Sequence, residues 1–365
     1  MKQSLCVHRV SAVGLAVLIF HSLAFAAMDT IEPRMDAFFR EYDKPNTPGA
    51  SVMILQQGKV LFAKGYGLAD LEARTPCTTN TNFRLASATK QFTAMAVMML
   101  AERKKLSVDE ALPDFFPEFP EYGRHITVRH LLSHTSGLID YEDIIPSGTT
   151  IPVLDRDVLR LLLKQDHMYF PPGSKFKYSN SAYALLALVI EARSGQTFAH
   201  FLRQSIFAPL KMNQTLAYEQ GSSIIRNRAY GYSARASAEG FERTDQSLTS
   251  SVLGDGGIYS SVVDLCRWDE ALYTTKLMRR KTLDQIFAPG PETDHGGTRY
   301  GFGWYIGSYR GVQEIWHSGN SRGFSTRIVR YPEKRFTISI LANRTDARLS
   351  EIPHQIADLL LFANP

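Results

Sequence analysis

Apolar runs divide the chain into strands at its two ends and helices between them. Residues 50–55 and 60–63 are separated by Gln-Gln-Gly-Lys, which is typical of a β-hairpin turn. Short apolar runs bounded by Gly, Pro-Glu-Lys and Asn-Arg predict C-terminal strands over residues 303–306, 313–316, 325–329 and 336–341. Strands at both ends predict an α+β fold with one antiparallel sheet built from both parts of the chain.

Helical spacing of apolar residues marks the other segments. It occurs over residues 30–42, 92–100, 128–132, 158–163, 182–192, 198–206 and 349–362. Turn signals such as Pro171-Pro172-Gly173 separate the central helices. No repeat or low-complexity linker is present, so we expect residues 27–365 to form a single domain with a mainly helical lobe inserted over about residues 106–235.

The first 26 residues have the layout of a secretory signal peptide. Lys2, His8 and Arg9 precede an apolar run over 12–20, and Ala24-Phe25-Ala26 is a small-x-small cleavage signal. The alternative is an uncleaved anchor, but the run is poor for a membrane span, which needs about 20 apolar residues. We therefore expect cleavage near Ala26, no stable membrane span afterwards, and a periplasmic or secreted protein.

The charge pattern argues against a nucleic-acid partner. The formal net charge is +5, but the basic residues form no long run. The densest clusters, at 103–105 and 279–281, follow apolar helical stretches, where cations suit the C-terminal end of a helix. No nucleic-acid recognition module accompanies these charges.

Cysteine and histidine spacing argues against a metal site. Cys77 and Cys266 remain after signal cleavage, either as one disulfide or as two free thiols. His130 and His134 are four residues apart but lack the Glu of His-Glu-x-x-His. No Cys/His spacing resembles a zinc site, so we expect no metal and no cofactor.

Ser87-Ala88-Thr89-Lys90 is the first candidate for chemistry. A serine hydroxyl is a poor nucleophile until a neighbouring base takes its proton, and residues three apart on a helix share one face. The pattern occurs twice, because Ser174 stands three residues before Lys177. An apolar helical segment follows Lys90, whereas Ser174 lies in a loop after Pro-Pro-Gly. The helix start and its free N–H groups favour Ser87.

Tyr178-Ser179-Asn180 is the only Tyr-x-Asn in the sequence. A phenol near a lysine ammonium can lose its proton below its usual pKa of about 10. It can then act as base for Ser87 and as acid to the leaving group. Asn180 offers a donor and an acceptor to a substrate or to Lys90. The alternative is a loop tyrosine followed by the N-cap of the next helix.

His317-Ser318-Gly319-Asn320 directly follows the strand predicted over 313–316. Gly319 would let a substrate approach the strand edge, and the Asn320 N–H can serve as an oxyanion donor. The alternative for His317 is a histidine at a strand end before a turn. His295-Gly296-Gly297 has a similar form but lies among turn residues, which makes it the weaker candidate.

In this order, Ser-x-x-Lys, Tyr-x-Asn and His-x-Gly resemble the motifs of the serine β-lactamase and penicillin-recognising hydrolase superfamily. Tyr-x-Asn and His-Ser-Gly resemble its class C-like branch, with family VIII carboxylesterases, D-aminopeptidases and D-Ala-D-Ala carboxypeptidases. Residues 127–138, Pro172-Gly173 and 256–260 support the resemblance, which extends from about Ile31 to Leu361. It implies a β-lactamase/transpeptidase-like fold with helices flanking the sheet.

The resemblance also implies a role for each motif. Ser87 is the acylated nucleophile, and Lys90 and Tyr178 share the general acid/base role. Asn180 binds substrate and orients Lys90. The segment around His134 shapes the helical lobe without taking part in chemistry.

The third motif bears on the substrate. His317 and Gly319 are expected to border the cleft, and the N–H groups of Ser87 and Asn320 to form the oxyanion hole. β-Lactamases and many carboxypeptidases of this superfamily place a lysine where His317 stands, to attract the substrate carboxylate. Histidine is neutral for much of the time near pH 7, which weakens the case for a β-lactam or peptide carboxylate.

Three arginines downstream could supply the missing charge: Arg322, Arg327 and Arg330. Arg327 and Arg330 face opposite sides of a strand, so at most one of these two points into the cleft. We therefore expect an exported serine hydrolase that acts on a small-molecule or peptide substrate, as a carboxylesterase or D-amino-acid peptidase. The alternatives are a true β-lactamase and a non-catalytic penicillin-binding-like module.

Overall fold

The computed structural model describes residues 31–363 of the 365-residue chain. The expected signal peptide, its cleavage site and Cys6 lie outside these residues. Residues 31–39 form a helix, within the segment expected to be helical, and bury Met35 and Phe39. The chain from Tyr42 onward forms a second unit, which contains the sheet and every candidate site residue.

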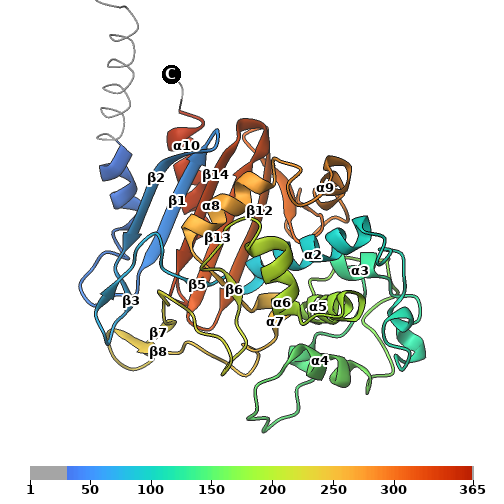
Figure 1. Ribbon diagram of the computed structural model, residues 1–365. Helices are drawn as coiled ribbons and strands as arrows, with labels where there is room; N and C mark the ends of the chain where they lie inside the picture. The colour runs from blue at the N-terminus through green and yellow to red at the C-terminus, as the bar shows by residue number, and fades with distance from the viewer. Residues whose placement is uncertain (1–30, 364–365) are drawn as a thin grey trace, which may run out of the picture. The chain divides into compact units, whose positions relative to one another are not determined.

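A seven-stranded antiparallel sheet joins the early and late parts of this second unit (Figure 1). In spatial order its strands are β10 (Arg299–Tyr300), β11 (Tyr305–Tyr309), β12 (Val312–Ser321), β13 (Phe324–Tyr331), β14 (Phe336–Ala342), β1 (Ala50–Gln56) and β2 (Lys59–Tyr66). β1 pairs with β14 along its whole length, from Ala50 opposite Ala342 to Gln56 opposite Phe336. The expected α+β fold, with an antiparallel sheet from both parts of the chain, is confirmed.

Helices from the centre of the chain form the lobe beside the sheet (Figure 1). They are α2 (Lys90–Glu102), α3 (Val128–Leu132), α4 (Asp155–Leu162), α5 (Asn180–Ser194) and α6 (Phe198–Leu202). α2 and α5 pack against each other and are apolar on nearly all sides, so they form the core of the lobe. α5 ends at Gly195, whose φ of 70° permits the left-handed C-terminal cap.

Helices cover both faces of the sheet. α8 (Val262–Ala271) packs on β1 and β14, and its Asp269 accepts from Arg330 of β13 at 2.6 Å. The next residue, Tyr331, points to the opposite face and donates to Glu314 at 2.7 Å. Glu314 also contacts His354 of α10 (Ile352–Leu360) at 2.8 Å, which places α10 on that opposite face.

The sequence predicted none of three helices in the C-terminal third, which are α7 (Leu253–Gly256), α8 and α9 (Arg280–Ile286). A start signal for α8 was present, because the Ser261 hydroxyl accepts from the Asp264 N–H in an N-cap. The strand expected to end at Trp316 continues to Ser321, so the His317 motif lies inside β12 and not after it.

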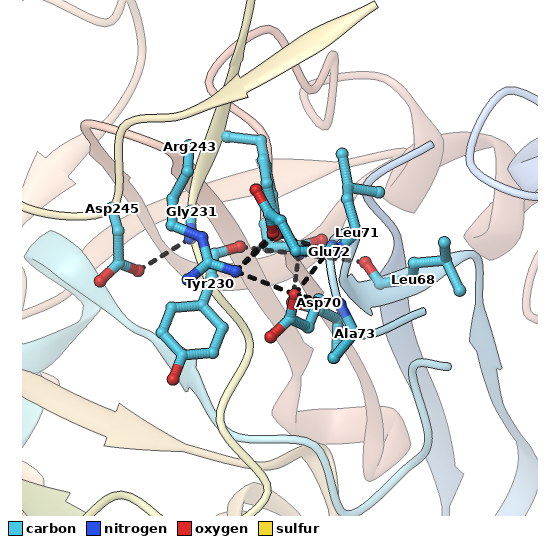
Figure 2. A network of polar contacts seen from close by, with 12 residues as sticks. Leu68, Asp70, Leu71, Glu72, Ala73, Tyr230, Gly231, Arg243 and Asp245 are labelled. Carbon is cyan, nitrogen blue, oxygen red and sulfur yellow. Dashed lines mark hydrogen bonds and ion pairs between the residues drawn. The ribbon is translucent and has the colours of Figure 1, made fainter. Parts of the chain in front are cut away.

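A polar network holds the loop after β3 (Leu68–Asp70) against the hairpin of β7 (Tyr232–Ala234) and β8 (Phe241–Arg243) (Figure 2). The Arg243 guanidinium donates to Asp70 at 2.8 Å and to Glu72, and it lies 4.0 Å from the centroid of the Tyr230 ring. The segment around Gly231 is thereby fixed against the β12–β13 turn, where a Cβ on Gly323 would lie 2.5 Å from the Gly231 Cα.

Candidate active site

Ser87 and Lys90 meet where a short 3-10 turn, η1 (Ala86–Thr89), runs into α2. The Lys90 Nζ lies 3.1 Å from the Ser87 Oγ. Ala86 has a φ of 47°, a left-handed conformation that is uncommon for a non-glycine residue and often found at functional sites. Ser87 is partly exposed and Lys90 is fully buried, so a substrate can reach the hydroxyl while the amine stays out of water.

Three oxygen atoms accept hydrogen bonds from the Lys90 Nζ. They are the Ser87 Oγ, the Asn180 Oδ1 at 2.9 Å and the Asp255 carbonyl at 3.0 Å. An ammonium has three N–H donors, so all of them are satisfied. Burial lowers the pKa of Lys90 to about 8, against the opposing charges of Asp255 and two further carboxylates. A substantial fraction of Lys90 is therefore in the neutral amine form at mildly alkaline pH, and only this form can act as a base for Ser87.

Asn180 is fixed at the first position of α5. Its N–H donates to the Asp140 carboxylate at 2.8 Å, and the Ser179 hydroxyl before it accepts from the Ala182 N–H as the helix N-cap. Because the Asn180 Oδ1 faces the Lys90 ammonium, its Nδ2 is the atom left to donate elsewhere. Tyr178-Ser179-Asn180 therefore serves both as a helix start and as part of the site.

The Tyr178 ring lies beside Lys90, with the Nζ 4.8 Å from the ring centroid. The phenol is fully buried, and no residue between 31 and 363 gives its hydroxyl a hydrogen bond of normal length and angle. Burial raises the pKa of Tyr178 well above 10, and an attractive contact with Ser87 only partly offsets this. The expectation that Lys90 lowers this pKa is wrong for the resting site, because desolvation dominates. Tyr178 is a neutral proton donor there.

His317 is a buried, neutral histidine. Its Nδ1 lies 2.6 Å from the Ser318 carbonyl, which can only accept, so Nδ1 carries the proton and Nε2 accepts from the Tyr300 hydroxyl at 3.0 Å. Burial, with a contribution from the Lys90 charge, lowers the pKa of His317 to about 3. His317 therefore supplies no positive charge to a substrate carboxylate in the resting site.

Gly319 allows β12 to approach the chain that leads into Ser87. A Cβ on Gly319 would lie 2.0 Å from the Leu85 carbonyl oxygen and 2.5 Å from the Thr326 Oγ1. The Thr326 hydroxyl itself donates to the Leu85 carbonyl at 2.9 Å. The fold itself therefore requires a glycine at position 319. The approach of a substrate to this strand edge stays a prediction.

Asn320 is exposed on the part of β12 that lies beyond its pairing with β11. That pairing ends with Tyr305 opposite Trp316, whereas β13 pairs along β12 as far as Ser321. The edge of β12 that faces away from β13 is therefore free of β11 from His317 onward.

The two downstream arginines do face opposite sides of β13. Arg330 is buried and bound to Asp269 under α8. Arg327 lies with its Cζ 3.8 Å from the centroid of a Trp316 ring, and it lines a cavity of about 340 Å³ together with Ser318 and Asn320. Arg327 is the one of the two that lies beside the third motif.

The competing motifs lie elsewhere. The Ser174 hydroxyl donates to the Pro171 carbonyl at 2.7 Å in an exposed loop. Lys177, three residues on, lies with its Nζ 4.7 Å from the Tyr169 ring centroid. His295 is exposed and packs against the rings of Tyr305 and Trp316. Neither motif contacts Lys90.

Three buried residues of the site lie outside the motifs that the sequence indicated: Tyr141, Asp255 and Tyr300. The Tyr141 hydroxyl donates to the Asp255 carboxylate at 3.0 Å. Asp255 directly precedes the 256–260 segment, which is the signal that could have pointed to it. We find no comparable sequence signal for Tyr300.

Three further findings concern the described part of the chain. Residues 31–363 contain no group of three or more His, Cys, Asp or Glu residues that could hold a metal ion. None of their helices is long and apolar enough to cross a bilayer. Cys77 and Cys266 are both free thiols, the second of the two alternatives, and burial raises the pKa of each.

Comparison with known proteins identifies the family. The family model described as Beta-lactamase matches residues 30–361. Penicillin-binding protein 4* of Bacillus subtilis (strain 168) is 31% identical over 345 residues, which are 91% of this chain and 76% of that protein.

Two solved structures have the same fold. The octameric penicillin-binding protein homologue from Pyrococcus abyssi superposes with a TM-score of 0.80 at 26% identity, over 93% of this chain and 78% of that one. The D-amino acid amidase from Ochrobactrum anthropi SV3, in its complex with L-phenylalanine amide, gives 0.71 at 26% identity, over 81% and 86%. The chain therefore belongs to the β-lactamase family of serine hydrolases.

Proposed function

We propose that this protein is an exported serine hydrolase that forms an acyl-enzyme on Ser87 from an ester or an amide. The observation that carries the proposal is the buried Lys90 amine, 3.1 Å from the Ser87 Oγ, with a pKa lowered to about 8. A D-amino acid amidase among its structural relatives supports an amide of the D-amino-acid type, and a carboxylic ester is the other candidate.

Acylation begins with the free-amine form of Lys90. It accepts the Ser87 proton while the Oγ forms a bond to the substrate carbonyl carbon. The carbonyl oxygen takes up the negative charge, and the N–H groups of Ser87 and Asn320 donate to it.

The geometry of β12 supports this role for Asn320. Residues two apart on an antiparallel strand direct their N–H and C=O groups to the same edge. The Ser318 carbonyl accepts from the His317 side chain, which fits an orientation toward the free edge, and Asn320 shares that edge.

The leaving group then departs with a proton. The C–O or C–N bond breaks, Tyr178 donates its proton to the leaving oxygen or nitrogen, and Lys90 returns a proton to Tyr178. In deacylation a water molecule gives a proton to Lys90 as its oxygen bonds to the acyl carbon. The Ser87 Oγ leaves and regains that proton. Asn180, with its Nδ2 unused by Lys90, would bind the acyl part of the substrate.

The site argues against two other functions. A true β-lactamase is disfavoured because neutral His317 replaces the cation that attracts the β-lactam carboxylate. A non-catalytic penicillin-binding module is disfavoured because such a module has no need for Ser87, Lys90 and Tyr178 in contact.

One labelling experiment tests the mechanism. Purified protein is treated with a fluorophosphonate probe and, separately, with penicillin, and the modified peptide is mapped by mass spectrometry. We expect an adduct on Ser87, no adduct in Ser87→Ala, and unchanged labelling in the matched control Ser174→Ala. An adduct on Ser174, or on no serine, contradicts the mechanism.

A substrate panel then separates the activities. Turnover of p-nitrophenyl esters or D-Ala p-nitroanilide well above that of nitrocefin is expected, and a D-Ala-D-Ala peptide tests carboxypeptidase activity. Nitrocefin turnover as fast as ester turnover would favour the β-lactamase.

The proposal of export rests on the first 26 residues, which predict a mature N-terminus at Ala27. N-terminal sequencing of protein from the extracytoplasmic fraction tests this.

A further inference from the structure

Asp255 carries a buried carboxyl group near Lys90, and the mechanism above does not use it. Asp255 belongs to α7 (Leu253–Gly256), which is a single helical turn. The backbone carbonyl of Asp255 accepts a hydrogen bond from the Lys90 Nζ at 3.0 Å. The residue is only 6% exposed. Its carboxylate accepts from the Tyr141 hydroxyl, which is also buried, at 3.0 Å. A buried carboxylate is unfavourable unless neighbouring charge and hydrogen bonds compensate it.

Three hydrogen bonds fix the turn that carries Asp255, and a fourth fixes the strand residue Ile258 just after it. The Asp155 carboxylate accepts from the N–H groups of Leu253 at 2.9 Å and Gly254 at 3.0 Å. The Thr93 hydroxyl of α2 donates to the Gly254 carbonyl at 2.7 Å, and the Ile258 N–H donates to the Thr89 hydroxyl at 3.2 Å. The turn is therefore tied both to α4 and to the helix that carries Lys90, so Asp255 keeps its place relative to the amine.

We propose that Asp255, held by Tyr141, is a positioning residue that keeps the Lys90 ammonium at Ser87 and sets, through its negative charge, the pH at which Lys90 takes the Ser87 proton. The backbone carbonyl provides the position and the carboxylate provides the charge. This inference rests on the proposed function, because it assigns Lys90 as the base.

The charges around Lys90 and Asp255 determine the direction in which Asp255 shifts the pKa of Lys90. Burial alone lowers the pKa of Lys90, and Asp255 is the largest of the carboxylates that raise it again. The Lys90 charge and the Tyr141 hydrogen bond in turn favour ionised Asp255, although burial still raises its pKa to about 6. Between about pH 6 and pH 8 the pair is therefore an ammonium and a carboxylate.

Other charged groups face the pair from the surrounding elements. Asp140 and Glu142 flank Tyr141, and Arg84 of β5 (Phe83–Arg84) acts on Asp255. Asp155 of α4 accepts hydrogen bonds from the backbone of α7. Each persists when the Asp255 charge is removed. Asp140 and Glu142 act on Lys90 in wild type and variant alike. Loss of the Asp255 charge also removes one of the causes that raise the pKa of Asp155, so the difference between the two profiles reports Asp255 together with this neighbour.

Asp255→Asn is the decisive variant, because it keeps the backbone carbonyl and the side-chain shape while removing the charge. Without that charge the Lys90 pKa falls. The rising limb of the kcat/KM–pH profile should then move to lower pH by about one unit, the lower end of shifts seen between close charges. Tyr141→Phe removes the hydrogen bond that favours ionised Asp255. It should therefore also move the rising limb to lower pH, by less than Asp255→Asn does.

The matched control is Asp284→Asn, which removes a carboxylate from an exposed ion pair on α9. Its pH profile should match wild type. If Asp255→Asn folds poorly, Tyr141→Phe carries the test. A purely structural role would lower activity at every pH and lower the thermal midpoint without moving the limb, and that result overturns the proposal.

The labelling experiment separates the two levels of inference. If Ser87 is labelled by the fluorophosphonate but neither variant moves the limb, the Asp255 proposal fails and the proposed function stands. If Ser87 is not labelled in wild type, the proposed function fails, whatever the pH profiles show.

Discussion

The imidazole of His134 lies against the phenol of Tyr178, with ring centroids 4.3 Å apart and an angle of 34° between the planes. The same imidazole accepts from the Ser179 N–H at 3.1 Å through Nδ1 and packs against the ring of Tyr300 at 4.6 Å. It is completely buried, and burial lowers its pKa well below 6.5, so it is neutral. One side chain thus fixes both the ring of Tyr178 and the backbone that follows it.

This contact predicts that His134 positions the proton donor. Replacing His134 with Leu removes the hydrogen bond to Ser179 and the ring contact, so the Tyr178 hydroxyl loses its place beside Ser87. We expect kcat to fall by about 10-fold or more, a part of the 10²–10⁴ that general acid–base catalysis supplies, with a smaller change in KM. Steady-state kinetics on a p-nitrophenyl ester measure this.

Two variants control the His134 prediction. His295→Leu, at an exposed histidine that also packs on aromatic rings, should retain wild-type kcat. His134→Asn can still accept from the Ser179 N–H and should recover part of the loss. If the His134→Leu protein folds and keeps the wild-type kcat, the positioning role is contradicted. The segment around His134 would then only shape the helical lobe, as the resemblance implies.

The pKa shifts predict an activity that rises with pH. Lys90 must be deprotonated to accept the Ser87 proton, and its pKa is lowered to about 8, so kcat/KM should increase as the pH passes through about 8. The pKa of Tyr178 is raised above its usual range, so the phenol stays protonated and gives no falling limb there. Initial rates on an ester stable over pH 6–9 test this.

The titration of His317 should not contribute to the kcat/KM–pH profile. Its pKa is lowered to about 3, so it is neutral on both sides of the limb. We expect His317→Asn to alter the height of the profile and not its midpoint. A falling limb between pH 6 and 8 would contradict the assignment of Lys90 as the base.

Most of the fold could be predicted from the sequence because it depends on local patterns of apolar residues. The apolar runs of β1 and β14 and the apolar helix α5 are visible as period and composition. The second half of β12 is not, because Ser318, Gly319 and Asn320 have low strand propensity and are held in the sheet by pairing with β13. That pairing becomes apparent only in the folded chain.

The candidate site divides in the same way. Motif order brought Ser87, Lys90 and Tyr178 into one hypothesis, and the structure brings these three side chains together. The protonation state of Tyr178 was misjudged, because desolvation depends on burial that spacing does not reveal. Asp255 was missed because its partners Lys90 and Tyr141 stand far away in the chain. Tyr300 was missed because its hydrogen bond to His317 forms only in the folded chain.

Tyr300 should be important for stability through His317. Its hydroxyl is the donor to the His317 Nε2, and both residues are buried. Tyr300→Phe leaves that acceptor unsatisfied, which should lower the free energy of unfolding by about 1–3 kcal/mol. Urea denaturation measures the change. Tyr169→Phe, which removes an exposed hydrogen bond to Asp143, should cost less, and equal losses in the two variants would contradict the argument.

Gly319 should not tolerate even one added methyl group. A Cβ there would lie 2.0 Å from the Leu85 carbonyl, two residues before Ser87, so β12 or the turn η1 must move. We expect Gly319→Ala to lower the free energy of unfolding by at least about 1 kcal/mol, as overpacking does, and to slow fluorophosphonate labelling of Ser87. Gly296→Ala is the matched control, because a Cβ at Gly296 meets nothing within 4 Å. If Gly319→Ala were as stable and as quickly labelled as this control, the close approach of β12 to Leu85 would not be what requires a glycine.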